Sequence, residues 1–307
     1  MPKENTHLYF AHRLLCDTEE PEWRNIINKE LEPYYLGAIA PDVFYYSGEE
    51  KTRRISETLH GRDGSPTNGI VFELLERAKA NKSGADLAFA LGYLTHCALD
   101  ITFHPVIYYL SGNYFDHDFD LANEAMYLHR HLETYLDKKV NQDFFFHHLI
   151  NLRHIRTLDF PKLFHERFGV PLGETEILLR RKNLASQFEN SRLVYYLFYF
   201  LYKLGLKKIK LFLGLFYANL TADPRVVPDL IDYRDIITGE KKRDLITDLF
   251  DRADNLASAY FEAAIDYFDG KIGRPEAEKF IQGESLNTGR FGLGVQNIKF
   301  TYNSHQK

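Results

Sequence analysis

The sequence is poor in sulfur and in tryptophan: its 307 residues include two cysteines, two methionines and one tryptophan. Two cysteines, Cys16 and Cys97, cannot form the disulfide framework that holds small secreted domains together. A chain of this length does not need one, because it can bury a large apolar core. The composition, 45% hydrophobic and 26% charged, is typical of a globular protein held together by packing.

No uninterrupted apolar run reaches the roughly 20 residues that a bilayer-spanning helix needs. The most apolar segment, 193–217, opens with ten apolar or aromatic residues and is then interrupted by four lysines: Lys203, Lys207, Lys208 and Lys210. This pattern fits a core helix with a solvated basic face, or a helix that lies on a membrane surface. No apolar stretch follows Lys3, so we expect no secretory signal and a cytoplasmic protein, with peripheral membrane contact as an open alternative.

The chain also lacks an excess of positive charge, since 38 lysines and arginines stand against 43 aspartates and glutamates, for a formal net charge of -5. A protein that binds nucleic acid through its phosphates carries an excess of lysine and arginine. We therefore expect no stable nucleic-acid complex. In contrast, histidine is abundant: the chain has 13 histidines, and eight of them precede residue 132. Aromatic residues make up 15% of the chain, which fits a lipid-facing cleft as well as ordinary packing.

Hydrophobic periodicity near 3.6 residues predicts an all-α fold. We expect helices over residues 6–16, 23–35, 70–80, 86–103, 121–140 and 244–270. Gly, Pro, Asn and Asp gather in expected loops over residues 47–53, 61–69, 111–119, 169–173 and 223–228. Because the tail from Gly283 is rich in Gly and Asn, we expect it to be loosely held.

Three polar side chains stand four residues apart in an otherwise apolar segment: His96, Asp100 and His104. On a helix this spacing places two imidazoles and one carboxylate on one face, one turn apart. In an apolar environment these groups cost on the order of several kcal/mol unless they are paired or bind a metal. Imidazole nitrogen and carboxylate oxygen suit zinc. We therefore predict a metal-binding face, and we expect Pro105 to end the helix directly after it.

A second pair with helical spacing, His129 and Glu133, follows within 40 residues. Such a pair is common on helix surfaces and carries little weight alone. Three further candidates lie upstream: His7, Asp42 at the end of an Ala-Pro-Asp run, and His60 before a turn. Each of them alone is more often structural, for example as a helix cap. Together they supply enough nitrogen and oxygen ligands for more than one metal ion.

The order of these motifs resembles the zinc-dependent phospholipase C family, which includes bacterial phosphatidylcholine-preferring phospholipases C and clostridial alpha-toxin. The matching pattern is His7, Gly-x-x-Ala-Pro-Asp42, His60, Gly-Tyr-Leu-Thr-His96-xxx-Asp100-xxx-His104-Pro and His129-xxx-Glu133. It covers the chain from about residue 5 to about residue 140. The same fold class carries zinc-dependent single-strand nucleases.

The resemblance implies an all-α, multi-helical domain of the phospholipase C and zinc nuclease type, with two or three Zn²⁺ ions in a cleft. It also implies a first zinc ion on His60, His96 and Asp100. Asp42 would lie beside this ion as a ligand or as the general base.

The second zinc ion implied by the resemblance is held by His104, His129 and Glu133, and a third by His7 and a bridging Asp100. The secreted enzymes complete the third site with an N-terminal tryptophan. This chain departs from them, because the six residues before His7 contain no tryptophan. Either processing of the chain or another ligand such as His12 would have to complete this site. The Asp100–His104 spacing is also shorter than in the secreted enzymes.

The resemblance implies hydrolysis of a phosphodiester by metal-bound hydroxide, because zinc lowers the pKa of bound water to about 7. A phospholipid is the expected substrate. Two alternatives stay open: a zinc-dependent nuclease or phosphatase on the same scaffold, and a metal-stabilised helical protein without turnover. We expect residues 1–150 to form the metal-binding region and residues 151–307 to form a helical C-terminal extension packed on it. The sequence does not indicate an oligomeric state.

Overall fold

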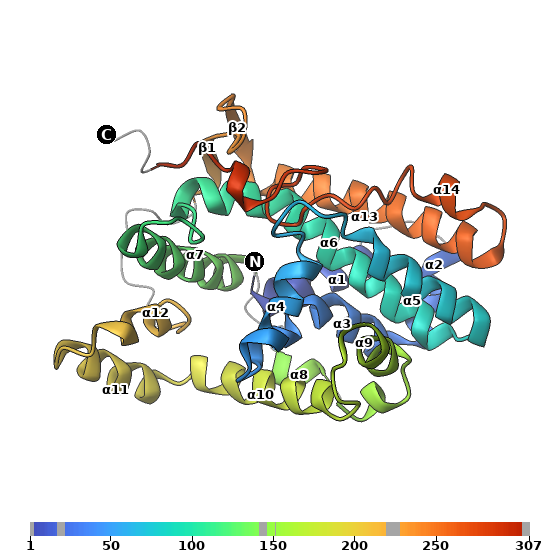
Figure 1. Ribbon diagram of the computed structural model, residues 1–307, viewed down its shortest axis with the longest axis horizontal. Helices are drawn as coiled ribbons and strands as arrows, with labels where there is room; N and C mark the ends of the chain where they lie inside the picture. The colour runs from blue at the N-terminus through green and yellow to red at the C-terminus, as the bar shows by residue number, and fades with distance from the viewer. Residues whose placement is uncertain (1–2, 17–21, 141–145, 151, 219–227, 303–307) are drawn as a thin grey trace.

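The computed structural model describes residues 3–16, 22–140, 146–150, 152–218 and 228–302, and most of its regular structure is helical (Figure 1). The longer helices are α1 (Glu4–Cys16), α5 (Asn68–Asn81), α6 (Gly84–Ser111), α7 (Phe119–Val140), α10 (Glu174–Glu189), α11 (Arg192–Lys203) and α13 (Ile246–Asp269). The shorter ones are α2 (Glu22–Lys29), α3 (Leu31–Ile39), α4 (Glu50–Leu59), α8 (Phe146–Leu149), α9 (Phe160–Phe168), α12 (Lys210–Leu213) and α14 (Arg274–Ala277).

Four short 3₁₀ helices complete the helical part: η1 (Ala40–Tyr46), η2 (Leu152–Arg156), η3 (Lys207–Ile209) and η4 (Val295–Asn297). The two strands of the described residues, β1 (Leu230–Arg234) and β2 (Lys241–Leu245), form one antiparallel hairpin with Ile231 opposite Asp244. The all-α prediction is confirmed. Among the described residues, the structure has no helix that combines the length and apolarity needed to cross a membrane.

Helix α6 is the centre of the molecule, and α1, α3, α5, α7 and α13 pack around it (Figure 1). The Ser83 side chain caps its N-terminus by accepting a hydrogen bond from the Asp86 amide at 3.1 Å. Every residue of α6 from Asp86 to Asp100 is buried, so the helix is covered on all its faces over this stretch. One main core cluster draws residues from Leu8 to Val295. The division of the chain near residue 150 stays a prediction.

The expectation that Pro105 ends this helix is wrong, because α6 continues to Ser111. A proline inside a helix leaves the carbonyl four residues earlier without its amide donor. The affected carbonyl belongs to Ile101, and Gly289 of the C-terminal tail packs against it. A Cβ at Gly289 would lie only 2.6 Å from that oxygen. The tail therefore covers the point at which the proline interrupts the helical hydrogen bonds.

Two further boundaries differ from the prediction. Residues 23–35 form two helices, α2 and α3, instead of one. The break falls at Glu30, which is not helical. Pro33 favours it, because a proline has no N–H to donate to the carbonyl of Lys29. The predicted loop over 47–53 is shorter, since α4 begins at Glu50. In the expected loop over 223–228, residues 223–227 lie outside the described residues.

The described part of the C-terminal tail, residues 283–302, is not loosely held where it meets the core, and residues 303–307 lie outside the described residues. Ser285, Leu286, Asn287 and Thr288 are buried, and the Leu286 amide donates to the carbonyl of His60 at 3.0 Å. Its glycine content serves this packing: Gly283 adopts φ 85° in contact with Asn68, where a side chain would collide. The composition that predicted a loose tail belongs to a segment folded tightly onto the core.

A close helix crossing joins α3 to α6. A Cβ at Gly92 would lie 1.9 Å from the backbone oxygen of Tyr34, and a Cβ at Gly37 would lie 2.0 Å from that of Phe89. Only glycine at both positions permits this approach. The crossing places the Ala38 carbonyl, at the end of α3, 2.9 Å from Nδ1 of His96.

We predict that Gly92→Ala lowers the free energy of unfolding by about 2–4 kcal/mol, because the backbone of α3 must move away from α6. The same movement should separate Ala38 from His96 and lower the zinc content. Urea unfolding and metal analysis measure both effects. Gly48→Ala is the matched control, since nothing lies within 4 Å of a Cβ there. Equal stability of the two variants would contradict the close crossing.

A buried carboxylate ties α1 to α7. Asp137 accepts hydrogen bonds from the amide of Thr6 at 2.8 Å, from the Thr6 hydroxyl and from the Tyr217 hydroxyl at 2.6 Å. Burial raises the pKa of Asp137 to about 6, although Lys3 and these donors act against the shift. The folded protein therefore retains a proton that the unfolded chain releases above pH about 4.

Because the folded-state pKa of Asp137 is the higher one, its contribution to stability is present at low pH and is lost as pH rises through about 6. We predict that the Asp137→Asn variant, whose side chain cannot ionise, does not lose this contribution to stability as the pH rises. The stability of the wild type relative to this variant should fall by about 2–3 kcal/mol between pH 4 and pH 7. Urea unfolding across this range tests it, with the exposed Asp232→Asn as control. A pH-independent difference would refute the shift.

Candidate metal centre

The structure brings all eight predicted site residues into one cluster. They come from five elements: α1 (His7), η1 (Asp42), the C-terminal cap of α4 (His60), α6 (His96, Asp100 and His104) and α7 (His129 and Glu133). Each of the eight is at most 6% exposed. The cluster therefore sits inside the helical core, where uncompensated polar groups are costly.

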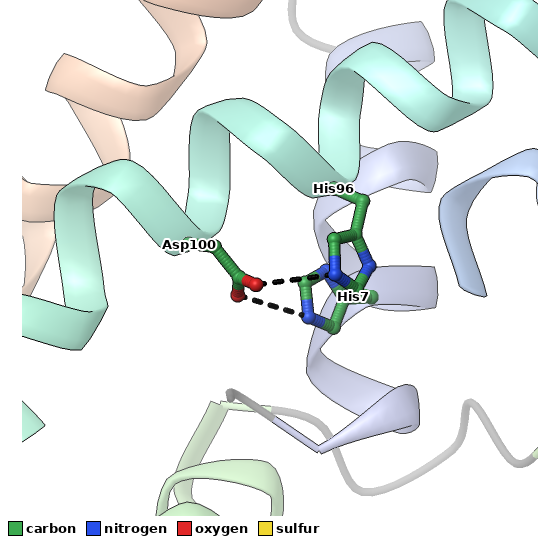
Figure 2. A group of neighbouring side chains, drawn as sticks. All are labelled: His7, His96 and Asp100. Carbon is green, nitrogen blue, oxygen red and sulfur yellow. Dashed lines mark ion pairs between the residues drawn. The ribbon is translucent and has the colours of Figure 1, made fainter. Parts of the chain in front are cut away.

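Asp100 lies at the centre of the cluster. Its Oδ2 is 3.1 Å from Nε2 of His96 and 3.4 Å from Nε2 of His60, and its Oδ1 is 3.3 Å from Nε2 of His7 and 3.7 Å from Nε2 of His104. Figure 2 shows Asp100 and His96 projecting from α6 toward His7 of α1, with the two ion pairs dashed. One carboxylate thus faces four imidazoles.

Backbone carbonyls orient three of these imidazoles. Nδ1 of His60 lies 2.6 Å from the carbonyl of Ser56, and Nδ1 of His104 lies 2.6 Å from that of Leu286. His96 makes the contact with Ala38 described above. Because a carbonyl oxygen only accepts, each of these Nδ1 atoms must carry the proton. The three Nε2 atoms are thereby turned into the cluster, which is how proteins orient metal-binding histidines.

The same arrangement sets two lone pairs against each other. Nε2 of His60 and Nε2 of His96 are 3.3 Å apart, and the Nδ1 proton of each ring is already donated to a carbonyl. In the neutral state both Nε2 atoms present lone pairs, which repel. A proton or a metal ion between them removes this conflict. This contact is a direct sign that the cluster fits a cation.

The distances fit zinc. Two ligands bound at about 2.0–2.2 Å to a tetrahedral ion lie about 3.3–3.6 Å apart. The ion pair of His60 Nε2 with Asp42 Oδ1 spans 3.3 Å and lies in this range. The pair of His129 Nε2 with Glu133 Oε1 spans 2.8 Å, a hydrogen-bond distance that would have to widen by about 0.5 Å around an ion. In the part of the chain that the structure describes, three groups of three residues have ligand atoms within 4.8 Å of one another: His7, His96 and Asp100; Asp42, His60 and His96; His104, His129 and Glu133.

Several polar atoms in the cluster make no hydrogen bond. Among the described residues these include both ring nitrogens of His7, both oxygens of Asp100, Oδ1 of Asp42 and Nε2 of His104. The ion-pair contacts around Asp100 and Asp42 are close but poorly aligned for hydrogen bonding. Buried polar atoms are nearly always satisfied, so this concentration of unsatisfied donors and acceptors fits metal coordination.

Burial keeps most of the imidazoles neutral, which is the form that binds metal. Desolvation lowers the pKa of His7 to about 4, with a further contribution from His96, and it lowers those of His104 and His129 well below the usual range. His60 is the exception: burial would lower its pKa, but its contacts with Asp100 and Asp42 outweigh burial and raise it to about 9. Burial alone would raise the pKa of Asp100, but its contacts with the imidazoles hold it well below its ordinary value, and protonated His60 keeps this carboxylate ionised.

The third predicted site differs from the expected one. His12 does not join the cluster: its Nδ1 lies 2.8 Å from the Tyr35 hydroxyl and its Nε2 lies 3.5 Å from Cys16 Sγ. His96 instead completes the group around His7. His131, two residues after His129, is also buried, but it lies outside the three groups and stacks on the ring of Tyr127. The roles of the eight residues as metal ligands stay a prediction.

Two contributors to the site were not predicted. The first is Lys182 of α10, which is 1% exposed and lies 4.0 Å from Oδ2 of Asp42. It stands in an Arg-Arg-Lys run that is typical of a solvated face, so no local signal distinguishes it. The second is Asn287 of the tail, whose side-chain nitrogen donates to the carbonyl of His60 at 2.9 Å and whose oxygen accepts from the Tyr108 hydroxyl at 2.9 Å.

Tyrosines lie at the edge of the cluster. The ring of Tyr45 is 5.8 Å from that of His60, and the ring of Tyr114 is 4.8 Å from that of His129. Both tyrosines are partly exposed, whereas Tyr108 is fully buried against Tyr114. Because the eight central residues are almost inaccessible, a substrate reaches them only if side chains at this edge move.

The fold and the cluster are those of a helical metal-binding protein. The comparison with known protein families identifies which family it belongs to. The profile of the zinc-dependent phospholipase C family matches residues 6–173, more than half of the chain. The chain therefore belongs to this family and is a zinc-dependent hydrolase. The match contains all eight site residues and extends beyond residue 140, where the resemblance in sequence ended. Lys182 and the tail lie outside it.

No curated protein and no solved structure matches the chain significantly.

We predict that Asn287→Leu, which keeps the size of the side chain, weakens zinc binding about 10–100-fold. The variant loses the hydrogen bond to the His60 carbonyl, and with it the anchor of the neighbouring Leu286 carbonyl that orients His104. Competition with a chromogenic chelator measures the affinity. The exposed tail variant Gln296→Leu serves as control and should bind zinc as the wild type does. Unchanged affinity in Asn287→Leu would mean that the tail only covers the site.

Proposed function

We propose that the protein hydrolyses a phosphodiester, with a phospholipid as substrate and with cleavage of the phospholipase C type. The observation that carries the proposal is one buried cluster of five imidazoles and three carboxylates. Backbone carbonyls turn the Nε2 atoms of three of these imidazoles, those of His60, His96 and His104, into the cluster. Membership of the zinc-dependent family supports the same conclusion. We infer that the cluster holds two or three zinc ions.

The eight side chains would share these ions through the three groups described above. The group of His104, His129 and Glu133 has no residue in common with the other two groups. The groups around His7 and around Asp42 share His96, and Asp100 lies between all of them. Zinc, when bound, lowers the pKa of a coordinated water and offsets the negative charge that grows on the phosphoryl oxygens.

Asp42 is the residue that we assign to proton transfer. Its Oδ1 faces His60 and its Oδ2 faces Lys182. Burial alone would raise the pKa of Asp42, but His96, His60 and Lys182 together hold it well below the usual range. An ionised carboxylate can accept a proton from the attacking water as the oxygen–phosphorus bond forms. Lys182 helps to keep this carboxylate ionised and fixed in place.

The leaving group is an alcohol, which needs a proton as the phosphorus–oxygen bond breaks. For a phospholipid this alcohol is the diacylglycerol, and the phosphorylated head group is the second product. The partly exposed tyrosines Tyr45, Tyr46 and Tyr114 supply aromatic surface at the edge of the site. Such rings suit an acyl-bearing substrate, and they also suit stacked bases.

A comparison of substrates therefore tests the proposal. Zinc-loaded protein is incubated with a phosphatidylcholine, with single-stranded DNA and with a simple phosphomonoester, each with and without a chelator. We expect hydrolysis of the phospholipid that the chelator abolishes. Preferred cleavage of DNA would assign a nuclease and preferred cleavage of the monoester a phosphatase. Zinc binding without any turnover would assign a metal-stabilised structural protein.

Two isosteric variants separate metal binding from catalysis. Asp100→Asn removes the charge between four imidazoles, so we predict loss of at least one zinc ion per chain and of activity. Asp42→Asn should lose activity by about 10²–10⁴-fold, the usual contribution of a general base, while it keeps most of its zinc. Asp235→Asn, a buried carboxylate that pairs with Lys242 and Arg290, is the control.

Full activity in Asp42→Asn with full zinc content would rule out its assigned role. Full zinc content in Asp100→Asn would show that the carboxylate is not a ligand.

A further inference from the structure

The segment 193–217, the most apolar of the chain, is not a core helix. Only Tyr195 of α11 is buried. Five large side chains of this helix and its C-terminal cap are 55–80% exposed: Leu193, Tyr196, Leu197, Phe200 and Leu204. Their spacing of three, four, seven and eleven residues from Leu193 places them on one helix face. A contiguous apolar face of this kind in water marks an interaction site.

The opposite face of α11 holds the helix in place. Tyr195 packs with Leu213 and Phe216 in a small cluster of its own, separate from the main core, and Tyr127 and Phe198 pack against it. In Figure 1, α11 and α12 project together at one end of the molecule, away from α13. The exposed stripe is therefore presented by a folded and anchored element.

This element is basic throughout. Between Glu189 and Asp223 the chain has no acidic residue and five basic ones: Arg192, Lys203, Lys207, Lys208 and Lys210. Arg192, Lys203, Lys207 and Lys208 are exposed, while Lys210 pairs with Glu124. The whole chain carries a net charge of -5, so this local excess of positive charge is distinctive.

We propose that α11 and the lysines after it form a docking surface for a phospholipid bilayer that contains anionic lipids. The apolar stripe would contact the acyl chains at the membrane surface, and the lysines beside it would contact the lipid phosphates. Tyr196 and Tyr199 add rings of the kind that gather at this boundary. Helix α11 has 12 residues, about 18 Å, so it lies along the surface.

A second copy of the chain fits this surface less well. Any symmetric pairing of two α11 helices would bring basic residues of both copies together, because the segment offers no acidic partner. A lipid surface supplies the missing negative charge without such a conflict. Charge complementarity therefore selects the anionic bilayer as the occupant.

The docking surface is joined directly to the candidate metal centre. Arg130, next to His129 in the chain, donates to the carbonyl of Leu211 at 2.9 Å, and the Thr134 hydroxyl, next to Glu133, donates to that of Gly214 at 2.9 Å. A docked α11–α12 segment would thus hold α7, and with it two of the predicted ligands, close to the membrane. This part of the inference rests on the proposed function, whereas lipid binding itself does not.

Vesicle sedimentation tests the proposal with the full-length Asp42→Asn protein, so that the lipid is not consumed. The two lipids are pure phosphatidylcholine and an equal mixture of phosphatidylcholine and phosphatidylglycerol. We expect strong binding to the mixture and weaker binding to phosphatidylcholine. At 1 M salt, where the Debye length is about 3 Å, the difference between the two should largely vanish.

Three sets of added substitutions assign the binding. The triple variant Leu193→Gln, Leu197→Gln and Phe200→Gln should bind both kinds of vesicle at least about tenfold more weakly. The triple variant Lys203→Gln, Lys207→Gln and Lys208→Gln should bind only the anionic vesicles more weakly, on the order of 100-fold. The control carries Gln at three exposed apolar residues elsewhere, Phe119, Leu172 and Phe291, and should bind as the parent does. Thermal unfolding and zinc content verify that each variant is folded.

Failure to bind anionic vesicles, or equal binding by the Leu193 set and its control, would overturn the docking surface. A dimer that this set converts to a monomer, without any change in lipid binding, would assign the stripe to a second copy and overturn it as well. The proposed function fails separately: wild-type protein that binds vesicles but hydrolyses no lipid refutes the phospholipase activity and leaves the docking surface standing. Hydrolysis of a soluble diester without vesicle binding refutes the docking surface and leaves the phosphodiesterase activity standing.

Discussion

The structure depends on one electrostatic constraint: three carboxylates and five imidazoles are buried together inside a helical core. Moving such groups out of water costs on the order of several kcal/mol each, unless opposite charges and hydrogen bonds compensate for the lost hydration. The contacts around Asp100 supply part of this compensation, and a proton or a metal ion between the opposed Nε2 atoms of His60 and His96 supplies more. We therefore expect metal binding to stabilise the fold.

Much of the fold serves to hold this cluster. The glycine crossing of α3 and α6 brings one carbonyl to His96, the end of α4 brings another to His60, and the tail brings a third to His104. Two of these carbonyls, those of Ala38 and Ser56, lie in the last turn of a helix. The Ser56 carbonyl accepts both the His60 amide at 3.0 Å and the His60 ring, so the same oxygen closes the helix and orients the imidazole. All three rings present the same nitrogen to the centre.

The regions outside the family match add properties of their own. Helix α10 contributes Lys182 to the centre, the tail supplies the carbonyl behind His104, and α11 carries the apolar and basic surface. The C-terminal half is therefore not a passive extension. It completes the environment of the candidate metal centre, and we propose that it also places that centre at its substrate.

The helical periodicity and the residue order were enough to predict the all-α class and the eight candidate residues. Spacings of four residues, as in His96, Asp100 and His104, are local: once the segment is helical, the face that they share follows from 3.6 residues per turn. Boundaries were less predictable. The continuation of α6 past Pro105 depends on Gly289, which is nearly two hundred residues away and packs against the affected carbonyl.

Only the tertiary structure decided which candidate metal-binding residues lie together in one group. It also decided that Lys182 faces Asp42 and that the start of the Gly-rich tail is buried. The oxygens that orient the imidazoles belong to the backbone, which is chemically the same at every residue and leaves no mark in the sequence. Whether a lysine or a glycine-rich segment faces water or a buried site depends on what packs against it from distant parts of the chain. Local pattern therefore determined the chemistry available to this protein, and long-range packing determined how that chemistry is assembled.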